Sequence, residues 1–155
     1  GNAGETVAFC QLVGAANLGV TLDVGHAIIA EERPAQSAAL LHRADRLFYV
    51  HLNDNDGRWD WDMLPGVYHL WEFVELFHTL EQLGYRDDWY GFDVFPKEND
   101  TKETFAAAVS MTRRLEAISK RLDTERLATL QHERNPARIT EYLYTVLAPE
   151  QTGEQ

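Results

Sequence analysis

Acidic and imidazole side chains occur at the ends of three short apolar segments of the sequence. Asp23 and His26 fall in TLDVGH, His51 falls in FYVHLND, and Asp93 falls in YGFDVFP. A carboxylate in an apolar segment is costly to bury unless it is paired or bound to a cation. Carboxylate oxygens together with imidazole suit Mn²⁺, Mg²⁺, Co²⁺ or Zn²⁺. The pattern therefore predicts a divalent metal site.

A polar loop after the second segment adds the run WDWD. Asp60 and Asp62 are two residues apart, so an extended backbone would point both carboxylates the same way, where they could clamp one ion. An acidic surface loop explains this pair equally well. Trp59 and Trp61 could stack on the flat face of a ligand or simply cover the core.

The ligand-bearing segments alternate with helical patterns along the chain. We expect strands at 20–24, 47–52 and 89–95, because these runs are short, rich in β-branched or aromatic residues and bounded by turn residues. Hydrophobic spacing and helix stop signals predict helices between and after them. The expected helices cover 5–16, 34–44, 68–83 and 101–122.

Strands that alternate with helices predict an α/β fold with parallel strands and right-handed crossovers. The C-terminal ends of parallel barrel strands are where active sites are built, which agrees with the positions of the candidate ligands. The chain has 155 residues, whereas a full (β/α)₈ TIM barrel needs about 250. We therefore expect a partial TIM barrel of about three βα units at 1–122. A helical tail at 123–155 would pack on the barrel or form an oligomer contact.

Net charge, cysteine content and the length of apolar stretches limit the partners and the compartment that we expect for this protein. The formal net charge of −11 and pI of about 4.9 disfavour binding to a phosphate backbone, so we expect no nucleic-acid partner. Cys10 is the only cysteine, which excludes an internal disulfide and fits a reducing compartment. We see no secretory signal and no apolar stretch of the roughly 18 residues that span a membrane. The sequence predicts a cytoplasmic protein without a membrane partner.

The motifs TLDVGH, LFYVHLND, WDWDMLPG and GFDVFPK together resemble the C-terminal half of the xylose-isomerase-like TIM barrel superfamily, over about residues 5–122. Xylose isomerase carries Glu where this chain has Asp23, and Asp where it has His51. Histidine at the second position resembles the L-rhamnose isomerase branch. The resemblance implies an aldose–ketose isomerase for a small sugar, working by a metal-assisted 1,2-hydride shift. Asp60 or Asp62 would orient the water that moves the hydroxyl proton.

The resemblance also implies two metal sites, a structural one at the strand ends and a catalytic one that includes the loop. The ligands would be Asp23, His51 and Asp93 for the first site, and His26, Asp60 and Asp62 for the second. The family's fourth structural ligand is a Glu, for which Glu5 is the only nearby candidate, and Glu5 begins a helix. We therefore expect this ligand to be missing and the site of the fragment to be incomplete. The open barrel edge predicts a homo-oligomer or association through that edge.

Three alternatives remain open. A ketose 3-epimerase of the same fold would share Asp23, His26 and His51, but would carry Glu where this chain has Asp93. A metal-dependent endonuclease of the same fold would need a basic groove, which the net charge disfavours. The third alternative is an inactive truncated domain.

Overall fold

The computed structural model describes residues 1–85, 89–97 and 99–149. A three-stranded parallel sheet lies at its centre, with the strands in the order β1-β2-β3. The strands are β1 (Val20–Asp23), β2 (Leu47–Leu52) and β3 (Tyr90–Phe92). The fold is thus the predicted α/β type with a parallel sheet, and it is consistent with a partial TIM barrel.

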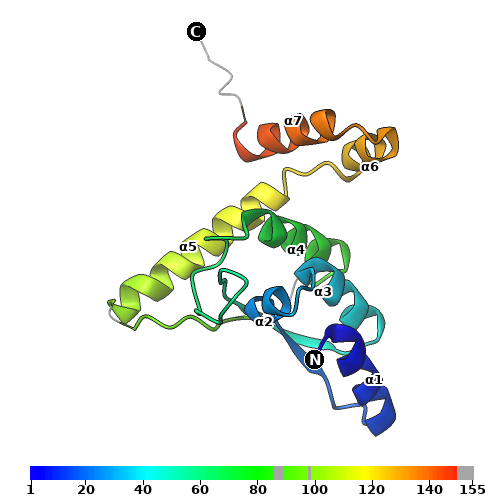
Figure 1. Cartoon of the computed structure of the whole chain (residues 1–155), viewed down its shortest axis with the longest axis vertical. Helices are drawn as coiled ribbons and strands as arrows, with labels where there is room; N and C mark the ends of the chain where they lie inside the picture. Colours follow the sequence, from blue (N-terminus) through cyan, green and yellow to red (C-terminus); the bar gives the residue numbers. More distant parts are fainter. Residues whose placement is uncertain (86–88, 98, 150–155) are drawn as a thin grey trace.

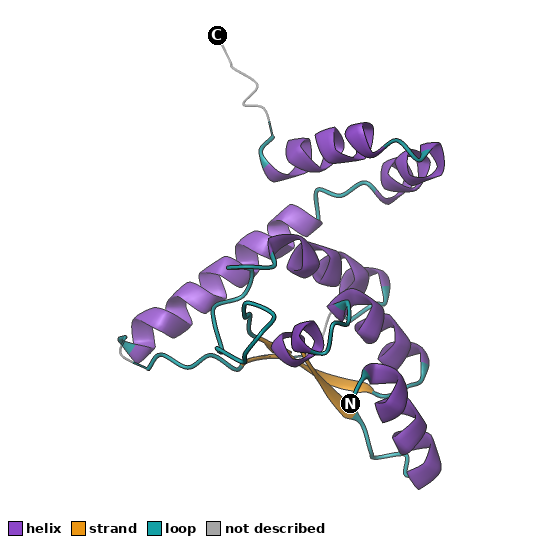
Figure 2. Cartoon of the chain, viewed as in Figure 1, coloured by secondary structure: helices purple, strands orange, loops and turns teal. Residues whose placement is uncertain are grey.

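Helices follow or precede every strand, as the alternation in sequence predicts (Figure 1). In the described residues they are α1 (Ala3–Val13), α2 (Val24–Ile29), α3 (Pro34–Arg43), α4 (Leu70–Gln82), α5 (Thr101–Ser119), α6 (Thr124–Glu133) and α7 (Pro136–Leu147). Figure 2 shows the strands crossing below the α3–α4–α5 layer. Each helix of this layer packs on the next, and α3 also contacts β1 and β2.

The two faces of the sheet differ in chemistry. Leu22, Val50 and Leu52 point to one face and are buried in the core with the apolar sides of α3 and α4. Because side chains alternate along a strand, Asp23 and His51 point to the other face. Their Cα atoms are register partners, one strand apart. The alternation thus separates a hydrophobic core from a polar face that carries the predicted ligands.

Two strand boundaries differ from the prediction because side chains and loops compete with the sheet. The first strand ends at Asp23, since the Asp23 carboxylate accepts a hydrogen bond from the His26 N–H at 3.0 Å and begins α2. The third strand ends at Phe92 and does not reach Phe95. The Phe95 N–H instead donates to the Asp62 carbonyl at 3.2 Å, which ties this segment to the polar loop.

Helix boundaries differ by a few residues where caps decide them. α1 ends at Val13 because Gly14 follows in the left-handed conformation, with φ 67°, which favours glycine. α7 begins at Pro136 because the Asn135 side chain accepts from the backbone of the first turn. Pro34 opens α3 as predicted. α4 is shorter than the periodicity indicates at both ends, and α5 is shorter at its C-terminal end.

The helices α6 and α7 form a hairpin that lies beyond the end of α5 in Figure 1. The Arg121 Nε donates to the Val146 carbonyl at 2.8 Å, and the Asp123 N–H donates to the Tyr142 hydroxyl at 2.7 Å. These bonds tie α7 to the segment that follows α5. The division into a barrel part and a tail remains a prediction.

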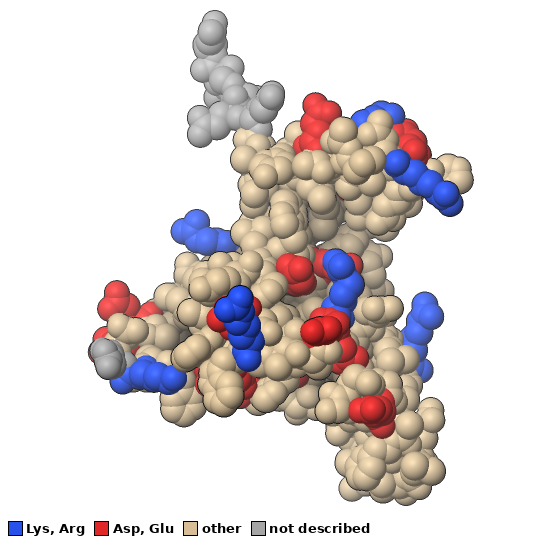
Figure 3. Space-filling view, in the orientation of Figure 1, with Lys and Arg blue, Asp and Glu red and all other residues tan. Residues whose placement is uncertain are grey.

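Charges of both signs are scattered over the face drawn in Figure 3, without a basic groove on that face. Within the described residues, no helix has the length and apolar character needed to cross a lipid bilayer.

Candidate metal centre

Asp23, His51 and Asp93 come together at the C-terminal ends of the three strands. One ligand atom from each lies within 4.8 Å of the others. The His51 Nδ1 is 3.5 Å from the Asp23 Oδ2 and 3.6 Å from the Asp93 Oδ2. Two ligands bound at about 2.1 Å, at angles of about 90–110°, would lie roughly 3.0–3.5 Å apart. The group could therefore hold a divalent ion with small movements of the side chains.

Asp23 is oriented by the local backbone. Its Oδ1 caps α2 by accepting from the His26 N–H, which leaves Oδ2 free to face His51. An N-cap residue has an extended backbone and a side chain that turns back over the helix. The short strand and the short helix after it therefore fix this carboxylate before any ion binds.

His51 is accommodated by a glycine on the neighbouring strand. The Cα atoms of His51 and Gly91 are register partners, and a Cβ at Gly91 would lie 2.8 Å from both the His51 Cδ2 and the Tyr49 hydroxyl. The Tyr49 ring also meets the His51 ring edge to face at 5.3 Å between centroids. Any larger residue at Gly91 would force the His51 ring or the Tyr49 ring to shift.

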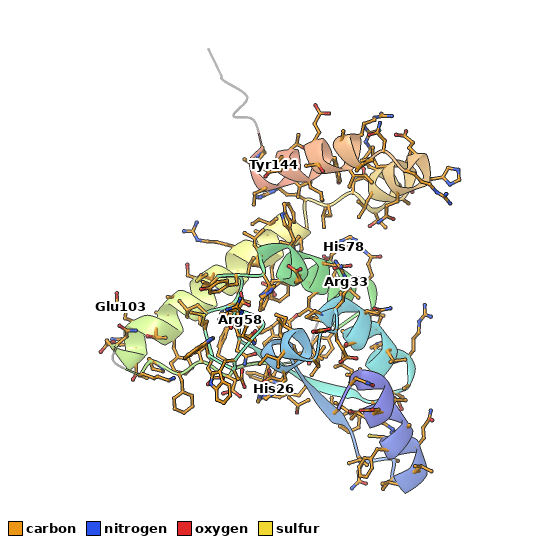
Figure 4. All side chains as sticks on the ribbon, in the orientation of Figure 1. His26, Arg33, Arg58, His78, Glu103 and Tyr144 are labelled. Carbon is orange, nitrogen blue, oxygen red and sulfur yellow. The ribbon has the colours of Figure 1, made fainter. Side chains whose placement is uncertain are left out.

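The polar loop brings a second pair of candidate ligands to the same edge. The His26 Nε2 lies 3.1 Å from the Asp60 Oδ2, and the Asp60 Oδ1 is buried without a hydrogen-bond partner in the structure. Figure 4 shows His26 beside the loop that carries Arg58, in agreement with this contact. The expected extended backbone at Asp60–Asp62 is wrong, because Asp62 has a φ of 50°. The two carboxylates therefore do not lie side by side through simple strand alternation.

Asp62 lies within electrostatic reach of both groups. Burial raises the pKa of its carboxyl group, and the negative charges of Asp60 and Asp93 raise it further, with a smaller contribution from Asp23. The Asn53 side-chain amide lowers the pKa of Asp62, although its Nδ2 is not in full hydrogen-bond geometry with any acceptor. Carboxylates crowded in this way repel one another, and a divalent cation would relieve that repulsion. This crowding fits a cation-binding role for the strand ends and the loop.

A comparison with family models supplies the family. The model described as xylose isomerase-like TIM barrel matches residues 1–115. The chain belongs to this family. A comparison with curated proteins gave no match. Members of the xylose isomerase-like family process sugars in many cases and often depend on a metal, which agrees with the group formed by Asp23, His51 and Asp93.

The tryptophans that the sequence singled out lie at the surface of the polar loop. Trp59 is 65% exposed and Trp61 is 44% exposed, so neither covers the core. The Lys97 Nζ lies over the Trp61 ring at 5.5 Å, and Trp61, Asp62, Phe95 and Lys97 line an open groove of about 530 Å³. The groove offers an aromatic wall next to a candidate ligand.

Glu5 lies outside the candidate site. Its carboxylate accepts from the Asn2 N–H at 3.1 Å, and the Asn2 side chain accepts from the Glu5 N–H. This is a capping box at the start of α1. The structure therefore uses Glu5 for the helix end and does not place it with Asp23, His51 and Asp93.

Sequence reasoning missed three consecutive buried polar residues after β2. Asn53, Asp54 and Asn55 are all fully buried. Asp54 is buried and does not face solvent; its carboxylate caps the start of α4 by accepting from the N–H groups of Tyr68 and His69, at 2.8 and 3.0 Å. A polar run directly after a buried parallel strand, at the edge where sites form, is the signal that could have found them.

Proposed function

We propose that this chain carries most of the divalent-metal site of an aldose–ketose sugar isomerase, closest in ligand pattern to the L-rhamnose isomerase branch. The observation that carries the proposal is the group of Asp23, His51 and Asp93, whose ligand atoms meet within 4.8 Å at the strand ends. Histidine between two aspartates is the feature that separates this pattern from that of xylose isomerase.

The proposed roles divide between the strand ends and the loop. One ion would be held by Asp23, His51 and Asp93, and a second by His26, Asp60 and Asp62. When bound, divalent ions act as Lewis acids that polarise a carbonyl and anchor hydroxyl groups.

The residues of the chain would supply position and proton transfer. Asp60 or Asp62 would orient the water that takes the proton from the substrate hydroxyl. Trp59 or Trp61 would pack against the apolar face of the sugar ring and limit the access of water. The groove between Trp61 and Phe95 gives such a sugar an apolar wall beside Asp62.

A ketose 3-epimerase remains the second candidate, since one observation favours it. Among the described residues, Asp23, His51 and Asp93 are the one group that satisfies the distance criterion for a metal site, and epimerisation at C3 requires one ion. The two reactions differ in solvent exchange, because epimerisation removes and returns a proton at C3, whereas a hydride shift moves hydrogen from C2 to C1 without exchange. With Mn²⁺ in D₂O, an epimerase would place deuterium at C3 of a ketose, whereas the isomerase would convert an aldose to a ketose between C1 and C2. Asp62→Asn should abolish the isomerase reaction and leave the ion at the strand ends bound.

Metal binding tests the proposal directly. Asp93→Asn keeps the size of the side chain and removes its charge, so the affinity for Mn²⁺ should fall by about 10–100-fold, as expected on loss of a ligand or its support. Titration calorimetry of the chain measures the affinity. Asp56→Asn is the matched control, because Asp56 lies in the same loop outside the ligand set and caps Arg58 and Trp59. Equal Mn²⁺ affinity in wild type and Asp93→Asn would refute the assignment.

A further inference from the structure

The buried run Asn53–Asn55 connects the strand ends, which carry one set of candidate ligands, with the loop that carries Asp60 and Asp62. Asn53 and Asn55 both form hydrogen bonds to the backbone of Gly25, in the turn between Asp23 and His26. The Asn53 Oδ1 accepts from the Gly25 N–H at 2.9 Å, and the Asn55 Nδ2 donates to the Gly25 carbonyl at 2.9 Å. A Cβ at Gly25 would lie 2.8 Å from the Asn53 Nδ2, so this close contact requires glycine.

Asp54, between the two asparagines, is bonded to the loop that carries Asp60 and Asp62. Its backbone makes two hydrogen bonds with Met63, one residue after Asp62: the Asp54 N–H donates to the Met63 carbonyl at 2.9 Å, and the Met63 N–H donates to the Asp54 carbonyl at 2.8 Å. These two hydrogen bonds join the two ends of the loop that carries Asp60 and Asp62.

The Asp54 side chain fixes where that loop meets the helical layer. One carboxylate oxygen accepts from the Tyr68 and His69 N–H groups, and the other accepts from the Asn55 N–H at 2.8 Å and faces the His69 Nδ1 at 2.8 Å. Since a carboxylate accepts, the His69 Nδ1 carries the proton in this contact. A buried carboxylate with several donors is strongly held.

We infer that Asp54 is a positioning residue, which holds the loop carrying Asp60 and Asp62 against the strand-end ligands without touching an ion or a substrate. The metal half of this inference rests on the proposed function, whereas the loop-holding half rests on the hydrogen bonds alone. Asp54 is fully buried and its contacts reach the loop base and the start of α4, so it acts on the loop through the backbone.

Hydrogen exchange tests the loop-holding half. Asp54→Asn keeps the shape, but its amide cannot accept on both sides, so the amides of Met63, Tyr68 and His69 should lose protection by about 10-fold or more. Amides of β2 and the middle of α4 should keep theirs. His69→Gln removes the ring contact alone and should give a smaller loss at the same amides. Asp56→Asn serves as the control and should leave all of them unchanged.

Mn²⁺ titration tests the metal half with a readout that a general loss of stability would not reproduce. Asp54→Asn should weaken the ion bound through Asp60 and Asp62 by about 10–100-fold, and should change the affinity of the strand-end ion by less than about threefold. The effect of Asp54→Asn should vanish in an Asp62→Asn background, because its target is then already lost.

The outcomes separate the inference from the proposed function. Unchanged protection of the Met63 and Tyr68 amides in Asp54→Asn would overturn the inference. A loss of protection at the β2 amides as large as the loss at these amides, in both Asp54→Asn and His69→Gln, would also overturn it. If the wild-type chain binds no Mn²⁺, the proposed function fails, and the exchange experiment still decides whether Asp54 holds the loop.

Discussion

At the scale of single residues, Asp62 is the carboxylate whose acidity departs most clearly from the ordinary range at this edge of the sheet. Its raised pKa reflects burial first and the charges of Asp60 and Asp93 second. A carboxyl group with a raised folded-state pKa favours the folded state fully below its unfolded pKa. That contribution is lost as the pH rises through the folded-state value. In the absence of a cation, ionised Asp62 therefore destabilises the fold at neutral pH.

We predict that Asp62→Asn stabilises the metal-free chain at pH 7. Removing one of several crowded charges should raise the melting temperature by about 1–3 °C, and the gain should shrink as the pH falls toward the ordinary aspartate pKa of about 4. Thermal unfolding in EDTA across this pH range measures the effect. Saturating Mn²⁺ should reverse the order, since the ion uses ionised Asp62 as a ligand. A variant that melts below wild type in EDTA at pH 7 would contradict the charge-crowding account.

The candidate ligands at the strand ends could be predicted from the sequence because each follows a short apolar run, and parallel strands bring such positions to one edge. Asp54 could not be placed in this way. Its burial depends on donors at Tyr68 and His69, and local pattern does not reveal that the chain returns there. The left-handed backbone of Asp62 escaped prediction for a related reason, because the hydrogen bond from Phe95 to the Asp62 carbonyl joins segments far apart in sequence.

At the scale of elements, the junction between β1 and α2 combines a ligand with a helix cap. Asp23 uses one oxygen for the His26 N–H and presents the other to His51. The periodicity of this segment predicts the strand, but it cannot show that the chain turns into a helix at Val24, because that turn is held by side-chain hydrogen bonds from Asp23, Asn53 and Asn55. β2, by contrast, was predicted with its observed bounds, since none of its side chains caps the backbone of a following helix.

Two substitutions at Asp23 should separate its roles. Asp23→Ser keeps a capping oxygen and removes the ligand, whereas Asp23→Ala removes both. Because both variants delete the same charge, the difference between them isolates the cap, and Asp23→Ala should be less stable than Asp23→Ser by about 1 kcal/mol. Both should lose most of the Mn²⁺ affinity. Urea unfolding and Mn²⁺ titration measure the two effects, and equal stabilities would show that the cap contributes nothing.

At the scale of the whole molecule, the sheet is open. Within the described residues, β1 and β3 each pair on one side, with β2 between them, and unpaired strand edges favour association. α1 adds exposed apolar side chains, with Leu12 at 88% and Phe9 at 59% exposure. Contiguous apolar surface of this kind marks an interaction site in soluble proteins.

We predict that the 155-residue chain self-associates in a concentration-dependent way. The double variant Phe9→Lys/Leu12→Lys should reduce the associated fraction by about 10-fold, because it places two charges on the apolar side of α1. Tyr144→Ser is the comparison for the tail, since Tyr144 is exposed on α7. Light scattering coupled to size exclusion measures the masses. A stable monomer at all concentrations contradicts the open-sheet contact, and a monomer produced by Tyr144→Ser alone assigns the contact to the tail.

The strand order has a consequence for synthesis on the ribosome. Because the strands lie in the sheet in the order in which they are made, each new strand adds to the edge left by the previous one, and none is inserted between two others. Asp23 and His51 can meet before the segment that carries Asp93 has left the exit tunnel. The nascent chain can therefore acquire its candidate ligands one at a time, as each strand pairs with the strand made just before it.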